Sequence, residues 1–253
     1  MSNLIKTTDQ IERIRVSAKI LSKTLKKLRN LVKPGVKLIE LDRFAKETIL
    51  EKGGKPAFLG YRPYGAKEPY PSTLCTSVND IIVHGRPTNY AVQKGDILKL
   101  DLGVNWKGGI SDAAITIAVG PITKEGGKLI KTTEKALKEG IRAVKPGHTL
   151  GDIGFAIERV ATSQNMKIID GLTGHGVGIE LHEDPVVYNF GKPGSGMVLK
   201  ENMVLAIEPM LSSRTGKIIQ LHDDSFATAD GSMSAHFEHT ILVTKRGAEI
   251  LTK

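Results

Sequence analysis

The chain has little of what a disulfide-bonded or membrane-spanning protein needs. Its 253 residues include one cysteine, Cys75, so no disulfide can form within the chain. No apolar run reaches the roughly 20 residues of a transmembrane helix, and the first 15 residues, MSNLIKTTDQIERIR, contain no apolar signal core. These absences argue against a secreted or membrane protein, and we expect a cytoplasmic protein in a reducing compartment.

Aromatic residues are also scarce, at 5%, and no RNA-binding motif accompanies the dispersed lysines. Positive charge is abundant, because 36 lysines and arginines against 27 acidic residues give a net charge of +9. Such a charge favours acidic partners such as RNA or the ribosome surface. It fits equally well a lysine-rich surface that only keeps the protein in solution, and the composition leaves both interpretations open.

A short motif occurs twice, 112 residues apart. The segment VKPGVKLIELDRFA, residues 32–45, aligns with VKPGHTLGDIGFAI, residues 144–157. Each copy predicts the end of one helix, a turn at Pro-Gly and a second amphipathic helix. Before the first copy, Thr7 and Gln10 have the spacing of a capping box, and an apolar stripe at helical period follows. Its members are Ile11, Ile14, Ala18, Leu21, Leu25, Leu28 and Val32. The matching segment 126–143 is lysine-rich, with a weaker stripe.

Strand-like segments follow each predicted helix pair. In the first part they are DIIVHG, DILKLDLGV and ISDAAITIAVG, and in the second they are GHGVGIELH, MVLAIEPML and FEHTILVT. Helices followed by strands, twice over, predict an α+β fold in which the helix pairs cover a curved, largely antiparallel sheet. We expect one domain, residues 1–253, with two pseudo-symmetric halves, about 1–120 and 121–253, and a site between them.

Two aspartates lie in a predicted hairpin, LDLGVNWKGGISDAAI, whose apolar strands flank the turn NWKGG. If Val104 pairs with Gly109, Asp101 lies directly opposite Asp112 and both carboxylates project from one face of the hairpin. Like charges in that arrangement destabilise a sheet, so a cation between them is the functional interpretation. The alternative is a different register that leaves one aspartate in solvent.

Two glutamates repeat this pattern in the second half. Glu208 in MVLAIEPML and Glu238 in SAHFEHTILV are each a lone acid within an apolar run. A buried, unpaired carboxylate must be protonated or find a partner, and no lysine or arginine on a strand is an obvious partner. Two divalent cations would balance the four acids in formal charge, and a hydroxide bridging them is chemically reasonable.

The stretch GHGVGIELHEDP places His175 and His182 seven residues apart among glycines and acids. In a regular strand an odd separation points two side chains to opposite faces. Both histidines therefore join one site only if the chain bends between them or if each meets a different part of that site. An oxygen-rich site with one imidazole suits manganese, iron, cobalt or zinc. His175, between close-packed glycines, is the expected nitrogen ligand, and His182 is left for another role.

The motifs LDLG…SDAA, GHGVG…LHEDP, AIEPM and AHFEHTI closely resemble those of the type I methionine aminopeptidases, and the resemblance covers essentially the whole chain. It implies the pita-bread fold and the hydrolytic removal of the initiator methionine from new polypeptides whose second residue is small. It also implies two bound divalent metal ions and the N-terminus of a nascent polypeptide as substrate. Under this resemblance the metal ligands are Asp101, Asp112, His175, Glu208 and Glu238.

The resemblance further implies three catalytic roles. His84, in DIIVHG, matches the histidine near the substrate amine and leaving group, and His182 matches the histidine that reaches the scissile peptide. A metal-bound hydroxide would attack the methionyl carbonyl, and Glu208 would take and return a proton. His182 would donate a hydrogen bond to the developing negative charge. Apart from the resemblance, both histidines fit ordinary structural roles.

The methionine pocket is where the sequence departs from the family pattern. By position it is lined by Phe58, Tyr61, Tyr70, Cys75 and Leu181. Phe58 stands where many bacterial members have cysteine, Leu181 where phenylalanine is usual, and Asp224 where a tryptophan is often found. The loop RPYGAKEP, residues 62–69, is longer than in the commonest bacterial form. These departures leave open both the side-chain selectivity and the tolerance for the second residue, and the aromatic residues also fit plain core packing.

Two rival functions remain to be compared with this one. A proline-specific peptidase of the same fold would carry an extra N-terminal domain, which has no counterpart in these 253 residues. A catalytically inactive relative that binds RNA or ribosomes would have no need of five buried acids and imidazoles. We expect a monomeric enzyme of one catalytic domain that binds neither DNA nor a membrane. Its candidate faces for the ribosome surface are the lysine-rich segments 21–30 and 126–140.

Overall fold

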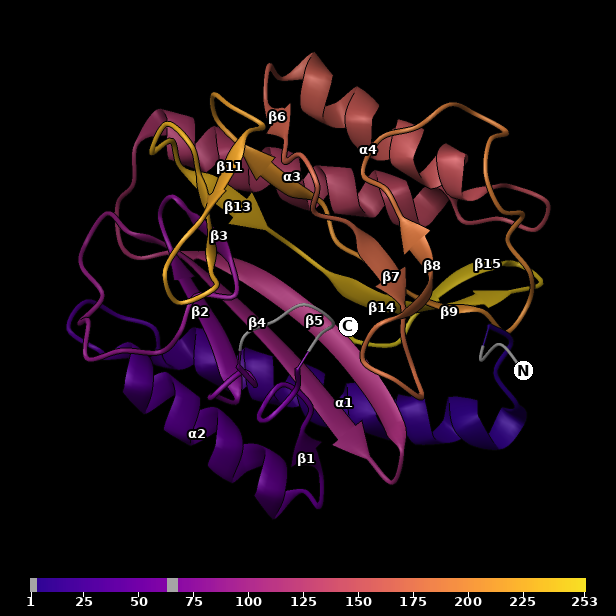
Figure 1. Ribbon diagram of the computed structural model, residues 1–253, viewed down its shortest axis with the longest axis horizontal. Coiled ribbons are helices and arrows are strands. Elements are labelled where there is room, and N and C mark those ends of the chain that lie inside the picture. Colours follow the sequence, from indigo (N-terminus) through magenta and orange to yellow (C-terminus); the bar gives the residue numbers. More distant parts are fainter. Residues whose placement is uncertain (1–3, 63–67) are drawn as a thin grey trace.

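The computed structural model describes residues 4–62 and 68–253, and helices run along the outside of its strands (Figure 1). The helices are α1 (Thr8–Leu31), α2 (Leu38–Glu51), α3 (Lys124–Ala143) and α4 (Leu150–Ser163). The pair α1 and α2 lies along one edge of the molecule, the pair α3 and α4 lies along the opposite edge, and strands fill the space between.

Among the described residues, the strands pair mostly within each half of the chain, with one pairing between the halves, and their relative orientation is the same throughout. Every strand pairing in the described part of the chain is antiparallel, so the predicted antiparallel sheet structure is confirmed. The first half contains β1 (Lys55–Pro56), β2 (Leu74–Val78), β3 (Ile81–Val83), β4 (Ile97–Trp106) and β5 (Gly109–Ala118). The second half contains β6 (Lys167–Ile168), β7 (Gly174–Gly176), β8 (Glu183–Val187), β9 (Val204–Ile207), β10 (Met210–Ser212), β11 (Ile218–Gln220), β12 (Phe226–Thr228), β13 (Ser234–His236), β14 (His239–Thr244) and β15 (Gly247–Ile250).

The predicted repeat is present as two matching helix pairs. The helices α2 and α4 each contain 14 residues, and their first residues are 112 positions apart, as are the last residues of α1 and α3. Gly35 and Gly147, one in each Pro-Gly turn, have φ of +93° and +81°. Glycine adopts this left-handed geometry without strain, which explains why the same turn chemistry ends the first helix of both pairs.

The N-terminal helix forms as the sequence predicts. Thr7 Oγ1 accepts a hydrogen bond from the Gln10 amide, and Gln10 Oε1 accepts one from the Thr7 amide, which completes the capping box. The apolar stripe from Ile11 to Leu28 is buried and α1 packs on β4 and β5. Burying each large member stabilises the fold by about 1.5–3 kcal/mol. In the part of the chain that the structure describes, no helix is long and apolar enough to cross a membrane.

The β4–β5 hairpin differs from the predicted register by two residues. We expected Val104 to pair with Gly109, but Trp106 pairs with Gly109 and leaves a two-residue turn. Lys107 and Gly108 in this turn have φ of +51° and +80°, as a type I′ hairpin turn requires. This tight turn is favoured over a longer loop because its twist matches that of the two strands.

The shift changes how the two aspartates of the hairpin face each other. Asp101 pairs with Ala114 and Asp112 pairs with Gly103, so the two carboxylates are diagonal neighbours. Because side chains alternate with a period of two, a shift of two residues keeps both on the same face. The predicted direct opposition is therefore wrong, while the predicted shared face is confirmed.

Candidate metal centre

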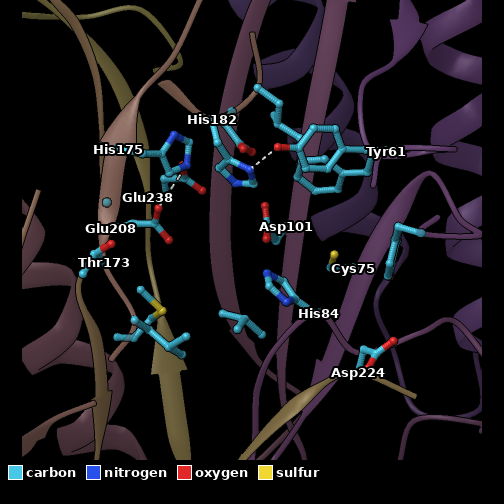
Figure 2. Close-up of a pocket in the computed structure, with 18 of the residues that line it drawn as sticks. Tyr61, Cys75, His84, Asp101, Thr173, His175, His182, Glu208, Asp224 and Glu238 are labelled. Carbon is cyan, nitrogen blue, oxygen red and sulfur yellow. Dashed lines mark hydrogen bonds and ion pairs between the residues drawn. The ribbon is translucent and has the colours of Figure 1, made fainter. Parts of the chain in front are cut away.

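A cavity of about 680 Å³ lies between residues of both halves of the chain. Figure 2 shows His175, Glu208 and Glu238 on one side of it, with Asp101 and His84 facing them. All five residues that the sequence analysis names as metal ligands line this cavity, namely Asp101, Asp112, His175, Glu208 and Glu238. The structure thus brings together acids that are separated by up to 137 positions in the sequence.

Asp101 and Asp112 are held inside the unbroken β4–β5 hairpin and are both buried. Burial raises the pKa of Asp101 to about 6. Burial, with Asp101 and Glu208 nearby, raises the pKa of Asp112 well above its usual range. Two neighbouring buried carboxyl groups resist ionising together unless positive charge is brought to them.

Lys99 does not supply that charge, although it lies on β4 two residues before Asp101. Its side chain is fully buried, and burial lowers its pKa to about 7. The amine donates to Asn79 O at 2.7 Å and is within 3.3 Å of the carbonyl and hydroxyl oxygens of Ser234. The Lys99 amine therefore bridges a turn of the first half and β13 of the second half. Its N–H donors point to the oxygens of Asn79 and Ser234 and not to the aspartates.

His175 lies on β7 between two glycines that allow close strand packing. A Cβ atom on Gly174 or Gly176 would lie 2.4 or 2.2 Å from a backbone oxygen of a neighbouring strand. His175 Nδ1 is 2.9 Å from the carbonyl oxygen of Gly176, so this nitrogen donates its proton there. The other ring nitrogen, Nε2, faces Glu208 Oε1 at 3.3 Å, and it is the atom that would bind a cation once its own proton is lost.

Glu208 and Glu238 lie where the strands of the second half are interrupted. Glu208 follows β9 and precedes Pro209, and Glu238 lies between β13 and β14. The Glu238 amide donates to Ala114 O on β5 at 3.0 Å. This bond ties the interrupted segment to the strand that carries Asp112.

The two glutamates have opposite electrostatic environments. Burial raises the pKa of Glu208, but the neighbouring imidazoles of His175 and His236 outweigh burial and lower it to about 2. Burial and the neighbouring Asp112 raise the pKa of Glu238 well above its usual range. Without added positive charge, therefore, ionisation is favoured at Glu208 and disfavoured at Glu238.

Unsatisfied oxygens show whether these residues fit a metal ion. Asp101 Oδ1, Asp112 Oδ1 and Glu238 Oε1 are buried without a hydrogen-bond partner, which is costly for a polar atom. Carboxylate oxygens together with imidazole nitrogens are a donor set suited to divalent transition metals. Ligand atoms lie within 4.8 Å of one another in two groups, Asp112 with His175 and Glu238, and Glu208 with His236 and Glu238. The residues present fit divalent cations.

A bend in the chain allows His182 to reach the cavity that His175 lines. Residues 178–182 form bends rather than a strand, and Gly178 has φ of +141°. The two imidazole rings end 4.4 Å apart, centre to centre. His182 Nδ1 is 2.7 Å from the hydroxyl of Tyr61 (Figure 2). The His182 side chain is exposed to the cavity, and desolvation by the surrounding protein lowers its pKa to about 3, which favours the neutral ring.

His84 follows β3 and projects into the cavity from the first half. Its φ of +61° is unusual for a residue other than glycine, and such conformations are often held in place at functional sites. Its ring packs edge-on against Phe226, with centroids 5.8 Å apart. The side chain is exposed to the open cavity, and desolvation by the surrounding protein lowers its pKa.

The five residues that the sequence analysis assigned to a methionine pocket all line the same cavity. They are Phe58, Tyr61, Tyr70, Cys75 and Leu181. The rings of Phe58 and Tyr70 pack edge to face at 6.5 Å. A Cβ atom on Gly103 would lie 2.6 Å from the Phe58 ring, so the large side chain at position 58 depends on glycine in β4. These residues make one end of the cavity apolar.

The altered positions at the cavity mouth are described in part. Asp224 lines the cavity and its carboxylate is 3.8 Å from the guanidinium of Arg86. Of the long loop 62–69, residues 63–67 lie outside the described residues. His236 was not predicted from the sequence as a site residue. It is fully buried, and its Nε2 is 3.3 Å from Glu208 Oε2. Its spacing of two from Glu238 was the available signal, because residues two apart on a strand share a face.

Comparisons with known proteins agree over the whole chain. A methionine aminopeptidase of Clostridium perfringens is 41% identical over 250 residues and the match covers 98% of each chain. Methionine aminopeptidase 1 of Bacillus subtilis is 37% identical over 251 residues, with 99% of each chain covered. The crystal structure of methionine aminopeptidase from Thermotoga maritima has a TM-score of 0.93 and 39% sequence identity, with 98% of each chain covered.

More distant similarity is limited to the fold. A prolidase from Pyrococcus furiosus has a TM-score of 0.79 and 24% sequence identity, and this chain spans 66% of its length. The expected pita-bread α+β fold is confirmed by these structural matches. The model of metallopeptidase family M24 matches residues 12–245, and the chain therefore belongs to this family.

Proposed function

We propose that this chain is a methionine aminopeptidase, a hydrolase that removes the N-terminal methionine of polypeptides whose second residue is small. The observation that carries the proposal is the full-length similarity to enzymes of that name, combined with a buried cluster of acids and imidazoles beside an apolar pocket. Residues 1–253 act as one catalytic domain, because both halves line the cavity.

Asp101, Asp112, His175, Glu208 and Glu238 are the residues that would hold two divalent cations. The burial of the four acids, the place of all five residues around one cavity and the unpaired oxygens of three of them support this assignment. When bound, such cations polarise a carbonyl group and lower the pKa of water by Lewis acidity. Manganese, iron, cobalt and zinc all suit a set of four carboxylates and one imidazole.

His182 stabilises the negative charge that develops on the methionyl carbonyl oxygen. Burial raises the pKa of the Tyr61 hydroxyl, so this group stays protonated and donates to His182 Nδ1. The proton of the neutral imidazole must then reside on Nε2. This N–H is the donor that His182 offers to the reacting carbonyl, as an oxyanion-stabilising group does.

Glu208 transfers a proton and His84 accepts a hydrogen bond at the scissile peptide bond. Glu208 is ionised and lines the cavity, so it can accept a proton from the attacking water and return it to the leaving amine. His84 is kept neutral by burial and can accept a hydrogen bond from that amine. The free α-amino group of the substrate is attracted by the surrounding carboxylates, which favours cleavage at a chain end.

The apolar end of the cavity selects the methionine side chain. Phe58, Tyr70, Cys75 and Leu181 present aromatic, sulfur and aliphatic surface there. An unbranched thioether fits such an irregular apolar space and gains from sulfur–aromatic contact. A β-branched or charged first residue would leave the space unfilled or bury an unpaired charge.

Release of free methionine from short peptides tests this function directly. We expect the protein, after metal removal and reloading with manganese or cobalt, to cleave Met-Ala-Ser but not Leu-Ala-Ser, and Met-Ala-Ser faster than Met-Leu-Ser. Cleavage of Ala-Pro peptides in preference to Met-Ala-Ser would instead identify a proline-specific peptidase. A metal-loaded protein that cleaves none of them would be a catalytically inactive relative.

We also propose the ribosome surface as a docking partner. The lysine-rich segments 21–30 and 126–140 lie in α1 and α3, on either side of a second groove of about 390 Å³. Lys26, Arg29, Lys138 and Arg142 line that groove. Cationic side chains on both walls are suited to the phosphate backbone of ribosomal RNA. This partner implies a cytoplasmic enzyme, which we expect to be a monomer.

Co-sedimentation with ribosomes across a salt series tests the docking proposal. Binding should weaken steeply with salt because RNA releases counterions on binding, while turnover on Met-Ala-Ser should change little. Replacing Lys26 and Arg29 with glutamine should weaken sedimentation without altering turnover on the peptide. Equal sedimentation of that variant and the unaltered protein would remove the groove from the interface.

A further inference from the structure

We propose that His236 is a positioning residue that holds the Glu208 carboxylate from the side facing away from the cavity. The inference rests on the proposed metal centre, in which Glu208 is a ligand. It assigns a role to a histidine that the five-ligand set leaves without one.

The Glu208 carboxylate lies between two imidazole rings. Its Oε1 atom is 3.3 Å from His175 Nε2, and its Oε2 atom is 3.3 Å from His236 Nε2. Neither ring nitrogen of His236 forms an aligned hydrogen bond with a described residue, although the side chain is 1% exposed. A buried imidazole whose nearby acceptor is a carboxylate oxygen offers its N–H to that oxygen.

The position of His236 relative to the cavity separates this role from direct metal binding. All five proposed ligand residues line the cavity, and so does His84, but His236 does not. Cations bound among the five ligands would contact Glu208 from the cavity, while His236 contacts it from within the protein. A residue that orients a metal-bound carboxylate in this way limits its rotation and tunes its affinity for the metal.

The backbone around His236 is fixed well enough for a positioning role. The Thr116 hydroxyl donates to His236 O at 2.5 Å, and the His236 amide is 3.0 Å from the same hydroxyl oxygen. Thr116 lies on β5 four residues after Asp112, and His236 pairs with Met210 on β10. The backbone of His236 is thus held both by the strand that carries Asp112 and by the strand that follows Glu208.

Cobalt titration of the metal-free protein tests this role without relying on turnover. His236→Met removes the donor and keeps the bulk, whereas His236→Gln keeps an N–H donor. We expect His236→Met to bind Co²⁺ about 10–100-fold more weakly and to alter the visible absorption of the Co²⁺ complex. His236→Gln should restore most of the affinity and the spectrum.

His239→Met is the matched control for these variants. His239 lies three residues further along, and its ring contacts the Thr252 hydroxyl at 2.9 Å. This variant should leave Co²⁺ affinity unchanged. Thermal unfolding of each metal-free variant shows whether it folds. If His236→Met does not fold, Thr116→Val tests the same role, because it removes the hydrogen bonds that hold the His236 backbone. Thr116→Val should weaken Co²⁺ binding in the same direction.

Three results would overturn the inference. The first is unchanged Co²⁺ affinity in folded His236→Met, and the second is a His236→Gln variant as weak as His236→Met. The third is X-ray absorption of the Co²⁺-loaded protein that shows an imidazole ligand lost in His236→Met, because His236 would then bind the metal directly. Methionine release by the unaltered protein is measured separately. Its absence would reject the proposed function, and weaker Co²⁺ binding in His236→Met would still support the positioning role.

Discussion

The two halves of the molecule present their acidic side chains to the cavity in different ways. In the first half, Asp101 and Asp112 lie inside β4 and β5, which pair without interruption over ten residues each. In the second half, the corresponding pair of strands is broken in the middle. The segment from β9 to β10 is interrupted at Glu208, and the segment from β13 to β14 is interrupted next to Glu238.

The interruptions change the hydrogen-bond partners of the backbone groups beside the two glutamates. At the first break Pro209 has no N–H to donate, and the side chain of Asn189 donates to Glu208 O at 3.2 Å. At the second break the Glu238 amide is released from its own sheet and donates to Ala114 O of the other half. A continuous hairpin holds two acids on one surface by local geometry, whereas a broken one directs its acids across the boundary between halves.

Removing one acid from each half tests whether this difference matters for function. Asp112→Asn and Glu238→Gln should each abolish methionine release and reduce the number of bound cations, because both are proposed ligands. The metal-free forms of both variants should be more stable to heat than the metal-free parent, since burial and neighbouring acids disfavour both carboxylates. Activity, metal content and thermal unfolding are the measurements.

A variant that binds two cations normally would show that its side chain is not a ligand. If only one of the two variants lost bound cations, the half of the molecule that carries its substituted residue would be the half that holds the metal. Glu134→Gln, on the exposed face of α3 where Glu134 pairs with Lys138, is the matched control for the loss of one negative charge.

The two histidines that we propose as catalytic, His84 and His182, also come from different halves. His84→Ala should keep the metals and lower kcat by about 10²–10⁴-fold, because it removes a partner in proton transfer. His182→Ala should lower kcat by about 10²–10³-fold, as the loss of one oxyanion donor does. His148→Ala, in the turn between α3 and α4, should have no effect on turnover. Full activity of His84→Ala would make His84 a structural residue.

The hairpin of the first half could be predicted because its information is local. Alternating apolar residues defined both strands, and the period of two placed Asp101 and Asp112 on one face whichever even register formed. The register itself was wrong because the Lys107–Gly108 pair was not recognised as a type I′ turn. Turn chemistry, rather than the hydrophobic pattern, sets pairing in a hairpin.

The elements of the second half could be predicted from pattern, but their assembly into one site could be predicted only through resemblance to a family. Each glutamate was recognisable as a lone acid in an apolar run, but nothing local indicates that β9 continues past Pro209 into a different sheet. His182 required a bend whose direction depends on Gly178 and on contacts far away in the sequence. His236 was overlooked because a histidine in a strand is as compatible with a structural role as with a functional one.

Helix packing gives a smaller contrast between the halves. Leu21 of α1 and Thr133 of α3 occupy equivalent positions 112 residues apart, and both side chains are fully buried. Leu21→Ala should destabilise the protein by about 2–5 kcal/mol through lost apolar contact and the cavity left behind. Thr133→Ala should cost about 1 kcal/mol, because it removes one hydrogen bond, from the hydroxyl to Leu129 O. Urea unfolding measures both, and equal losses would contradict the ranking.

The smallest expected effect concerns the first turns of α2 and α4. Asp152 in α4 accepts hydrogen bonds from the Thr149 amide at 2.7 Å and hydroxyl at 2.9 Å. At the equivalent place in α2, Glu40 accepts one from the Lys37 amide at 3.1 Å. Asp152→Asn keeps an acceptor oxygen but removes a negative charge from the first helical turn, so it should destabilise the protein by about 0.3–1 kcal/mol at neutral pH, and Glu40→Gln by less.

The pH dependence distinguishes the charged cap from an ordinary polar one. The hydrogen bond from the Thr149 amide N–H, more than any other contact, lowers the pKa of Asp152 in the folded state. A carboxyl group with a lowered folded pKa contributes stability that is fully present above its unfolded pKa and is lost as the pH falls through its folded pKa. The gap in unfolding free energy between Asp152→Asn and the parent should therefore be present at pH 7 and shrink towards pH 3. If this difference in unfolding free energy stayed constant from pH 7 to pH 3, the destabilisation would come from altered packing of the asparagine side chain and not from the loss of the negative charge.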